Sequence, residues 1–130
     1  MNEDYRHSDL TGEIINRFYK VYNTLGYGFL EKVYEKALKY ELEKAGLFVE
    51  RQKPINVYYE TELVGEYFAD LLVENKIIIE IKASEAICEE HENQLINYLK
   101  ATEVEVGLLL NFGKKPEIKR KIFSNKDKEK

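Results

Sequence analysis

A chain of 130 residues with 44% hydrophobic and 34% charged side chains suits one globular domain and leaves little room for a second. A net charge of −4 and a pI near 5.4 argue against a protein that coats nucleic acid through bulk positive charge. Because every apolar run is shorter than the roughly 18 to 20 residues that cross a bilayer, the sequence predicts no membrane role.

Cysteine content and the N-terminal residues favour a cytoplasmic protein. Cys88 is the single cysteine and cannot form an internal disulfide, and the first residues have neither the apolar run nor the basic start of a secretory signal. We expect one domain over residues 1–123, followed by a flexible charged tail over residues 124–130.

Positive charge is concentrated near the end of the sequence. Residues 112–130 hold eight Lys or Arg against three Asp or Glu, a balance of +5, which leaves 12 minus 21, or −9, on the first 111 residues. This segment could bind the phosphate backbone of nucleic acid, and a solvated tail is an equally good interpretation. The candidate phosphate contacts are Lys114, Lys115, Lys119, Arg120 and Lys121.

Two helices are predicted in the first third of the chain. The first begins at Ser8 as N-cap and ends at Gly26, with apolar residues at helical spacing between them. The second runs from about residue 29 to residue 45 and is closed by Gly46. Glu31 falls inside the apolar stripe of this second helix.

After Gly46 the hydrophobic period changes from helical to strand-like. Three β-branched and aromatic segments predict an antiparallel meander over residues 55–59, 63–73 and 76–82. A helix over about 84–100 and a buried strand over 106–111 follow, so that strand should lie parallel to the third through a right-handed crossover. The expected class is therefore α/β, with two N-terminal helices and a mixed sheet of about four strands.

The central chemical feature is the set Asp70, Glu80 and Lys82. Side chains alternate along a strand, so Glu80 and Lys82 share one face of the third strand. If residues 74–76 form a three-residue loop, Asp70 lies opposite Glu80. Two carboxylates and a lysine could hold a divalent cation, or they could form a surface salt-bridge ladder.

Three further residues are candidates for the same site. Glu31 could supply a third carboxylate, although a glutamate in a first helical turn also favours the helix dipole. Gln94 and Tyr98 are i and i+4 neighbours, so one helix face could present an amide and a hydroxyl beside the site.

These residues resemble the motif of the PD-(D/E)xK nuclease superfamily, whose restriction-endonuclease-like core has the predicted order of helices and strands. Gln94 and Tyr98 resemble the Q-x-x-x-Y signature of its exonuclease branch. More specifically, the chain resembles the small GxxExxY proteins over about residues 10–123. The segments that carry this likeness are 28–34 (GFLEKVY), 64–70 (VGEYFAD), 94–101 (QLINYLKA) and 111–113 (NFG).

The resemblance implies a nuclease that uses Mg²⁺ or Mn²⁺ to hydrolyse nucleic acid, with DNA as the favoured substrate. The implied ligands are Glu31, Asp70, Glu80 and the carbonyl of Ile81. Lys82 would orient or activate the attacking water or stabilise the phosphate, and Gln94 and Tyr98 would position the strand.

Two alternatives use the same residues differently. The chain could be a binding or regulatory module that keeps the nuclease fold without cutting, with a partner protein or a homodimer supplying the rest of the surface. It could also be a metal-dependent hydrolase of a small phosphate compound, which would require a closed pocket. Salt-dependent affinity for nucleic acid separates the nuclease from the small-molecule hydrolase.

Overall fold

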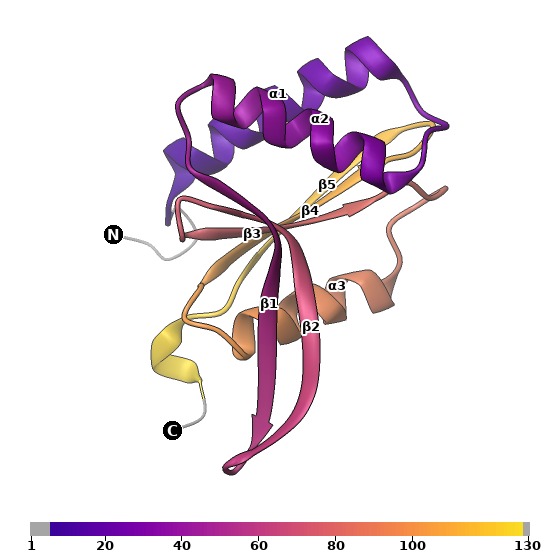
Figure 1. Cartoon of the computed structure of the whole chain (residues 1–130). Coiled ribbons are helices and arrows are strands. Elements are labelled where there is room, and N and C mark those ends of the chain that lie inside the picture. The colour runs from indigo at the N-terminus through magenta and orange to yellow at the C-terminus, as the bar shows by residue number, and fades with distance from the viewer. Residues whose placement is uncertain (1–5, 129–130) are drawn as a thin grey trace.

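The computed structural model describes residues 6–128, which form a sheet between two helical layers (Figure 1). The elements in chain order are α1 (Ser8–Leu25), α2 (Glu31–Lys44), β1 (Val49–Tyr59), β2 (Glu62–Val73), β3 (Ile77–Lys82), α3 (Glu89–Lys100), β4 (Val106–Phe112), β5 (Pro116–Ile122) and the 3₁₀ helix η2 (Asn125–Asp127). Helices α1 and α2 cover one face of the sheet and α3 covers the other.

The sheet has the strand order β1-β2-β3-β4-β5, and only β3 and β4 are parallel. The predicted α/β class, the meander and the crossover helix are confirmed, and the sheet has one strand more than expected. The additional strand, β5, lies in the basic segment. Its single proline and its charges suit an edge strand, because Pro116 stands at the first position and the lysines discourage pairing with another chain.

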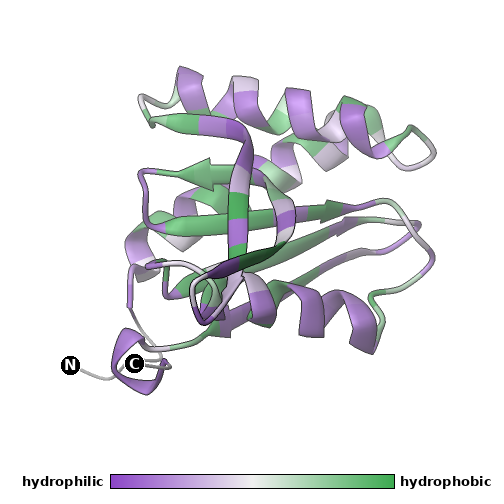
Figure 2. Ribbon diagram, turned by 60° about the horizontal axis from the view of Figure 1, so that its bottom comes forward, coloured by the Kyte–Doolittle hydropathy of each residue, from purple (hydrophilic) through white to green (hydrophobic). Residues whose placement is uncertain are grey.

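Apolar side chains fill both faces of the sheet, and the central strands are the most hydrophobic part of the molecule (Figure 2). Strand β4 is buried throughout because helices cover it on both sides. On the α1 and α2 face, the Tyr34 ring stacks on Phe112 with centroids 4.2 Å apart. The Tyr34 hydroxyl donates to the Gly26 carbonyl (2.7 Å) and accepts from the Phe29 N–H (3.1 Å), which fixes the connection between α1 and α2.

Some element ends differ from the sequence-based prediction. His7, with a left-handed backbone, occupies the N-cap of α1, and Ser8 is the first helical residue. The third helix begins at Glu89, because residues 84–88 are held in a loop by side chains from β4 and β5. Strand β1 begins at Val49, six residues before the predicted start.

The hairpin of β1 and β2 twists sharply at Gln52 and Asp70. Gln52 has a left-handed φ of 54°, and β2 pairs with β3 only over Leu71–Val73. Ala69 packs in the α3-side core and Leu71 in the opposite core, although two-residue spacing normally keeps side chains on one face. Beyond this twist, residues 53–69 project past the sheet as an arm (Figure 1).

Residues 124–128 pack against the domain, where the sequence suggested the start of a flexible tail. Ser124 is buried, and the Lys128 Nζ donates to the carbonyls of Thr102 and Val104, both at 2.8 Å. Residues 129–130 lie outside the described part of the chain. Among residues 6–128, no helix has the length and hydrophobicity to span a membrane.

Candidate active site

The Asp70 and Glu80 carboxylates each accept a backbone hydrogen bond from the other's strand where β2 leaves β3. The Asp70 N–H donates to Glu80 Oε2 (2.9 Å), and the Ile81 N–H donates to Asp70 Oδ2 (2.8 Å). These residues stand one step beyond the last paired residues, Leu71 and Ile79, in the register that the three-residue loop predicts. The carboxylates thus take over backbone donors that a continued ladder would have satisfied.

The environment of Glu80 strongly disfavours its charge. Its side chain is 4% exposed, and burial, with the neighbouring Asp70 carboxylate second, raises the pKa of Glu80 to about 8. The hydrogen bond from the Asp70 N–H and the positive charge of Lys82 act in the opposite direction. A second positive charge at this point would therefore stabilise the ionised pair.

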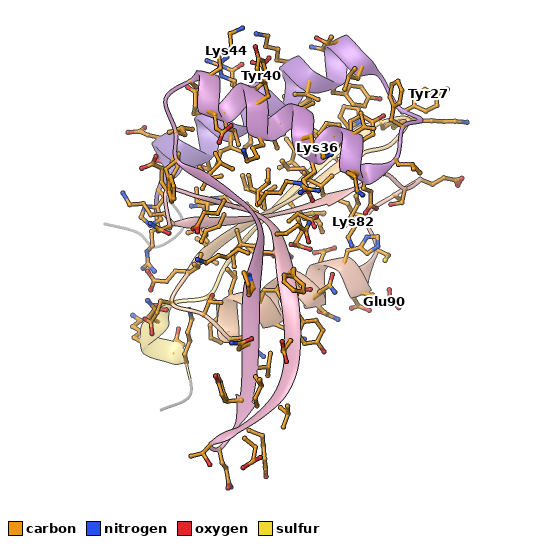
Figure 3. The ribbon with its side chains drawn as sticks, in the orientation of Figure 1. Tyr27, Lys36, Tyr40, Lys44, Lys82 and Glu90 are labelled. Atoms are coloured by element: carbon orange, nitrogen blue, oxygen red, sulfur yellow. The ribbon has the colours of Figure 1, made fainter. Side chains whose placement is uncertain are left out.

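Lys82 ends β3 two residues after Glu80 and is half-buried. Strand alternation places both side chains on the α3 face of the sheet. Figure 3 shows Lys82 on the side of the molecule where the N-terminal ends of α2 and α3 lie. The structure therefore brings Asp70, Glu80 and Lys82 to one end of β3.

Helix α2 contributes two carboxylates to this region, and only one was singled out from the sequence. The Glu31 carboxylate is exposed and accepts from the Ala83 N–H (3.3 Å), just beyond Lys82. Glu35, one turn later, is 5% exposed and was missed. It lies beside Tyr34 on the helix face that carries the buried Leu38 and Leu42, and this position in the apolar stripe was the available signal.

Glu35 is held by residues of β1 at the twist. Its Oε1 accepts from Gln52 Nε2 (2.8 Å), and its Oε2 forms an ion pair with Arg51. Gln52 Nε2 also lies 3.4 Å from Asp70 Oδ1 and links the two carboxylates. Burial, followed by the charge of Asp70, raises the pKa of Glu35.

The implied metal ligands do not form a compact cluster. Across residues 6–128, no three Asp, Glu, His or Cys side chains converge closely enough to hold a metal ion. Asp70 and Glu80 lie together, since each carboxylate accepts a backbone hydrogen bond from the other's strand. Ile81 joins them through its backbone, and Glu31 reaches the next segment at Ala83.

Gln94 and Tyr98 lie on α3 and line a groove between α3 and the arm. Burial, with the charges of Glu80 and Asp70 next, raises the pKa of Tyr98 to about 12, so its hydroxyl remains a hydrogen-bond donor at neutral pH. The groove has a volume of about 930 Å³. Its lining residues are Asn56, Val57, Tyr58, Glu60, Tyr67, Glu90, Asn93, Gln94, Asn97, Tyr98, Lys100 and Ala101.

A polar network behind the site holds the loop over residues 83–88. The Asn111 side chain accepts from the Ser84 N–H (2.9 Å) and donates to the Ser84 carbonyl (3.0 Å). Glu117 accepts from Asn111 and from the Ile87 N–H. A Cβ at Gly113 would lie 2.3 Å from the Ser84 oxygen, so the loop requires glycine there. This network fixes the backbone that follows Lys82.

The five candidate phosphate-binding residues do not share one surface. Lys114 and Lys115 are exposed in the turn between β4 and β5. Register places Lys119 and Lys121 on the α3 face and Arg120 on the opposite face. Lys121 forms an ion pair with Glu92 (2.6 Å), and Arg120 donates to the Arg6 carbonyl.

Comparison with known proteins identifies the family. The family model described as PD-(D/E)XK nuclease superfamily matches residues 8–121, which include every part of the site. This chain belongs to the PD-(D/E)XK nuclease superfamily. The match spans Asp70, Glu80 and Lys82, whose assignment to a superfamily motif stays a prediction, as does the narrower GxxExxY resemblance.

The solved structures show the same fold in a larger protein. This superfamily member matches a structure described as "Crystal structure of SSO0001" with a TM-score of 0.56 and 20% sequence identity. The match covers 94% of the present chain and 62% of that protein, so the chain spans less than two thirds of its length. No curated protein matches the sequence closely.

Proposed function

We propose that the chain is a metal-dependent nuclease that hydrolyses phosphodiester bonds in nucleic acid, with DNA the favoured substrate. The pairing of the Asp70 and Glu80 carboxylates beside Lys82, in which each accepts a backbone N–H from the other's strand, carries this proposal. Membership of a nuclease superfamily supports it, because the matched residues 8–121 include Asp70, Glu80 and Lys82.

The donor set fits Mg²⁺ or Mn²⁺. Each carboxylate accepts a backbone N–H through one oxygen. We propose the second oxygens of Asp70 and Glu80 as ligands, joined by Glu31 and the Ile81 carbonyl. Hard divalent cations prefer such oxygen donors. The raised pKa of Glu80 is a further reason for a cation to bind here, because a nearby positive charge would stabilise the ionised carboxylate. When bound, the cation supplies Lewis acidity toward the phosphate and the attacking water.

The protein's own residues would prepare the substrate around these ligands. Lys82 holds a positive charge at the end of β3 and would hydrogen-bond the attacking water or a phosphate oxygen. Tyr98 and Gln94 would donate hydrogen bonds to the substrate strand, since both line the groove beside the carboxylates. Lys114 and Lys115 are proposed outer phosphate contacts.

A second candidate, a nuclease-fold binding module that does not cut, is favoured by one observation. Only two carboxylates converge within the described residues, and Glu35 is committed to Arg51 and Gln52. Such a module would bind nucleic acid without hydrolysing it, and a partner protein or a second copy of the chain would supply the rest of the binding surface.

A cleavage panel separates these functions. Purified protein is incubated with single-stranded, duplex, branched and RNA substrates in Mg²⁺, in Mn²⁺ and in EDTA. The nuclease proposal expects at least one substrate to be cut with a metal and none in EDTA. Retained binding without metal-dependent cutting of any substrate would establish the non-cutting module, and hydrolysis of mononucleotides alone would indicate a small-phosphate hydrolase.

A further inference from the structure

The groove between the arm and α3 presents aromatic rings from two elements. On the arm, the exposed fractions of Tyr58 and Tyr67 are 59% and 47%, which are large values for residues that line a groove. The Tyr67 ring lies 5.8 Å from the ring of Tyr98 on α3. Rings with accessible faces are surfaces on which nucleic-acid bases stack, largely without regard to sequence.

Side-chain amides complement these rings. Asn93, Gln94 and Asn97 line the groove from α3, and Asn56 lines it from β1. Each amide offers both hydrogen-bond donors and an acceptor, which is the mixture found on the edges of bases. A phosphate offers acceptors only, so a surface built for phosphates would be expected to carry lysine and arginine instead.

The charge of the groove argues against binding that depends mainly on phosphates. Its lining holds one cation, Lys100, and two anions, Glu60 and Glu90, a balance of 1 minus 2, or −1. Duplex binding depends on cations that neutralise the backbone, and the base faces of a duplex are already stacked on one another. The groove therefore matches bases that are unpaired.

One residue of the groove, Tyr98, lies close to the candidate active site. Tyr98 lines the groove, is 6% exposed, and lies near enough to Glu80 and Asp70 for their charges to act on its hydroxyl. We infer that the groove binds unpaired bases, and that the substrate is a single strand or a single-stranded end led to Asp70 and Glu80. The second part rests on the proposed nuclease function, and the first does not.

A tryptophan in the groove gives a direct binding measurement. The chain contains no Trp, so Tyr67→Trp introduces a single tryptophan at the ring that faces Tyr98. Binding is measured in EDTA, where no metal-dependent cut occurs. We expect single-stranded DNA or RNA oligonucleotides to quench this fluorescence, with much weaker quenching by a blunt duplex or a mononucleotide.

Matched variants assign the binding energy to stacking. With labelled single strands, Tyr67→Leu and Tyr58→Leu should each weaken affinity about tenfold, and Tyr67→Phe should stay within about twofold of wild type, because the stacking face remains. Tyr40→Ala, at an exposed tyrosine of α2 remote from the groove (Figure 3), should leave affinity unchanged. The tenfold loss should be the same at about 50 and 200 mM salt, since stacking is not screened.

Three results would overturn the inference about the groove. They are tighter binding of the blunt duplex than of the single strand, equal affinity for a mononucleotide and an oligonucleotide, and wild-type affinity in a correctly folded Tyr67→Leu variant. Folding is checked by circular dichroism and by the Tyr67→Phe variant. Cleavage of duplex without single-strand binding would refute the groove and keep the nuclease, whereas single-strand binding without any cleavage would refute the nuclease and keep the groove.

Discussion

Asp70 and Glu80 each hold the backbone of the other's strand, because the Asp70 N–H donates to Glu80 and the Ile81 N–H donates to Asp70. The two carboxylates stand where β2 separates from β3 and where hydrogen bonds of the ladder stop. The same contacts that end the strand pairing therefore bring two negative charges together. This arrangement is costly without a positive charge and is the basis of the predictions below.

Replacing Asp70 by Asn should remove most of the stability that Mg²⁺ or Mn²⁺ confers. Asparagine can still accept from the Ile81 N–H, and it removes the repulsion of Glu80, so the metal-free protein should melt at the same or a higher temperature. Wild type should gain about 2.7 kcal/mol at a metal concentration 100 times Kd. Thermal melts with increasing Mn²⁺ test this, with the exposed residue Asp9→Asn as control. An undiminished gain in Asp70→Asn would contradict it.

Glu31 and Glu35 of α2 should respond differently to replacement by Gln. Glu31→Gln should weaken the Mn²⁺-dependent gain with little effect on the metal-free protein, since Glu31 is exposed. Glu35→Gln should lower the free energy of unfolding by about 1 to 3 kcal/mol, because it weakens the pairing of this buried side chain with Arg51 and Gln52. Denaturant unfolding with and without Mn²⁺ measures both effects. If Glu35→Gln instead weakened the Mn²⁺-dependent gain and Glu31→Gln did not, Glu35 would be the ligand.

The stability of the metal-free protein should fall as pH rises, through Glu80. Its pKa is about 8 in the folded chain and near 4.5 when unperturbed, so the folded state binds the proton more tightly. The contribution of Glu80 to the free energy of unfolding is then fully present below pH 4.5 and is lost as pH rises toward 8. Glu80→Gln mimics the protonated acid and should flatten this slope. Unfolding in EDTA across this range is the measurement, with Glu66→Gln of the arm as control, and equal slopes in Glu80→Gln and wild type would refute it.

Gly113→Ala should destabilise the protein by about 1 to 3 kcal/mol, because the added Cβ would lie 2.3 Å from the Ser84 carbonyl oxygen. The loop after Lys82 must then move, so activity should fall as well. Gly12→Ala is the matched control, since a Cβ there meets nothing within 4 Å and alanine favours a helix by up to about 1 kcal/mol. Equal melting temperatures of Gly113→Ala and wild type would show that the loop adjusts freely.

Local pattern was sufficient to predict the central part of the fold. The polar residues 74–76 between two apolar runs gave the hairpin register, and strand alternation then placed Glu80 with Lys82. The order of helices and strands also followed from the change of hydrophobic period. These features depend on neighbours in sequence, which is why a single chain reveals them.

The remaining features depend on contacts between distant segments. The twist in β1 depends on a left-handed backbone conformation at Gln52. Because this residue is not glycine, nothing in the sequence indicated the twist. Glu35 is buried only because Arg51 and Gln52 arrive from β1. Strand β5 was not predicted because its many charged residues obscure the strand pattern. Helix α3 begins later than predicted because Asn111 and Glu117 hold the preceding loop.

The most direct test of the nuclease proposal is the single-turnover cleavage rate of Lys82→Ala on whichever substrate wild type cuts. Lys82 would act on the water or the phosphate and not on the cation, so the variant should keep most of its Mn²⁺-dependent stability and lose about 100-fold or more in rate. Lys44→Ala, exposed near the far end of α2 (Figure 3), should cut like wild type. A wild-type rate in Lys82→Ala would contradict the proposed site.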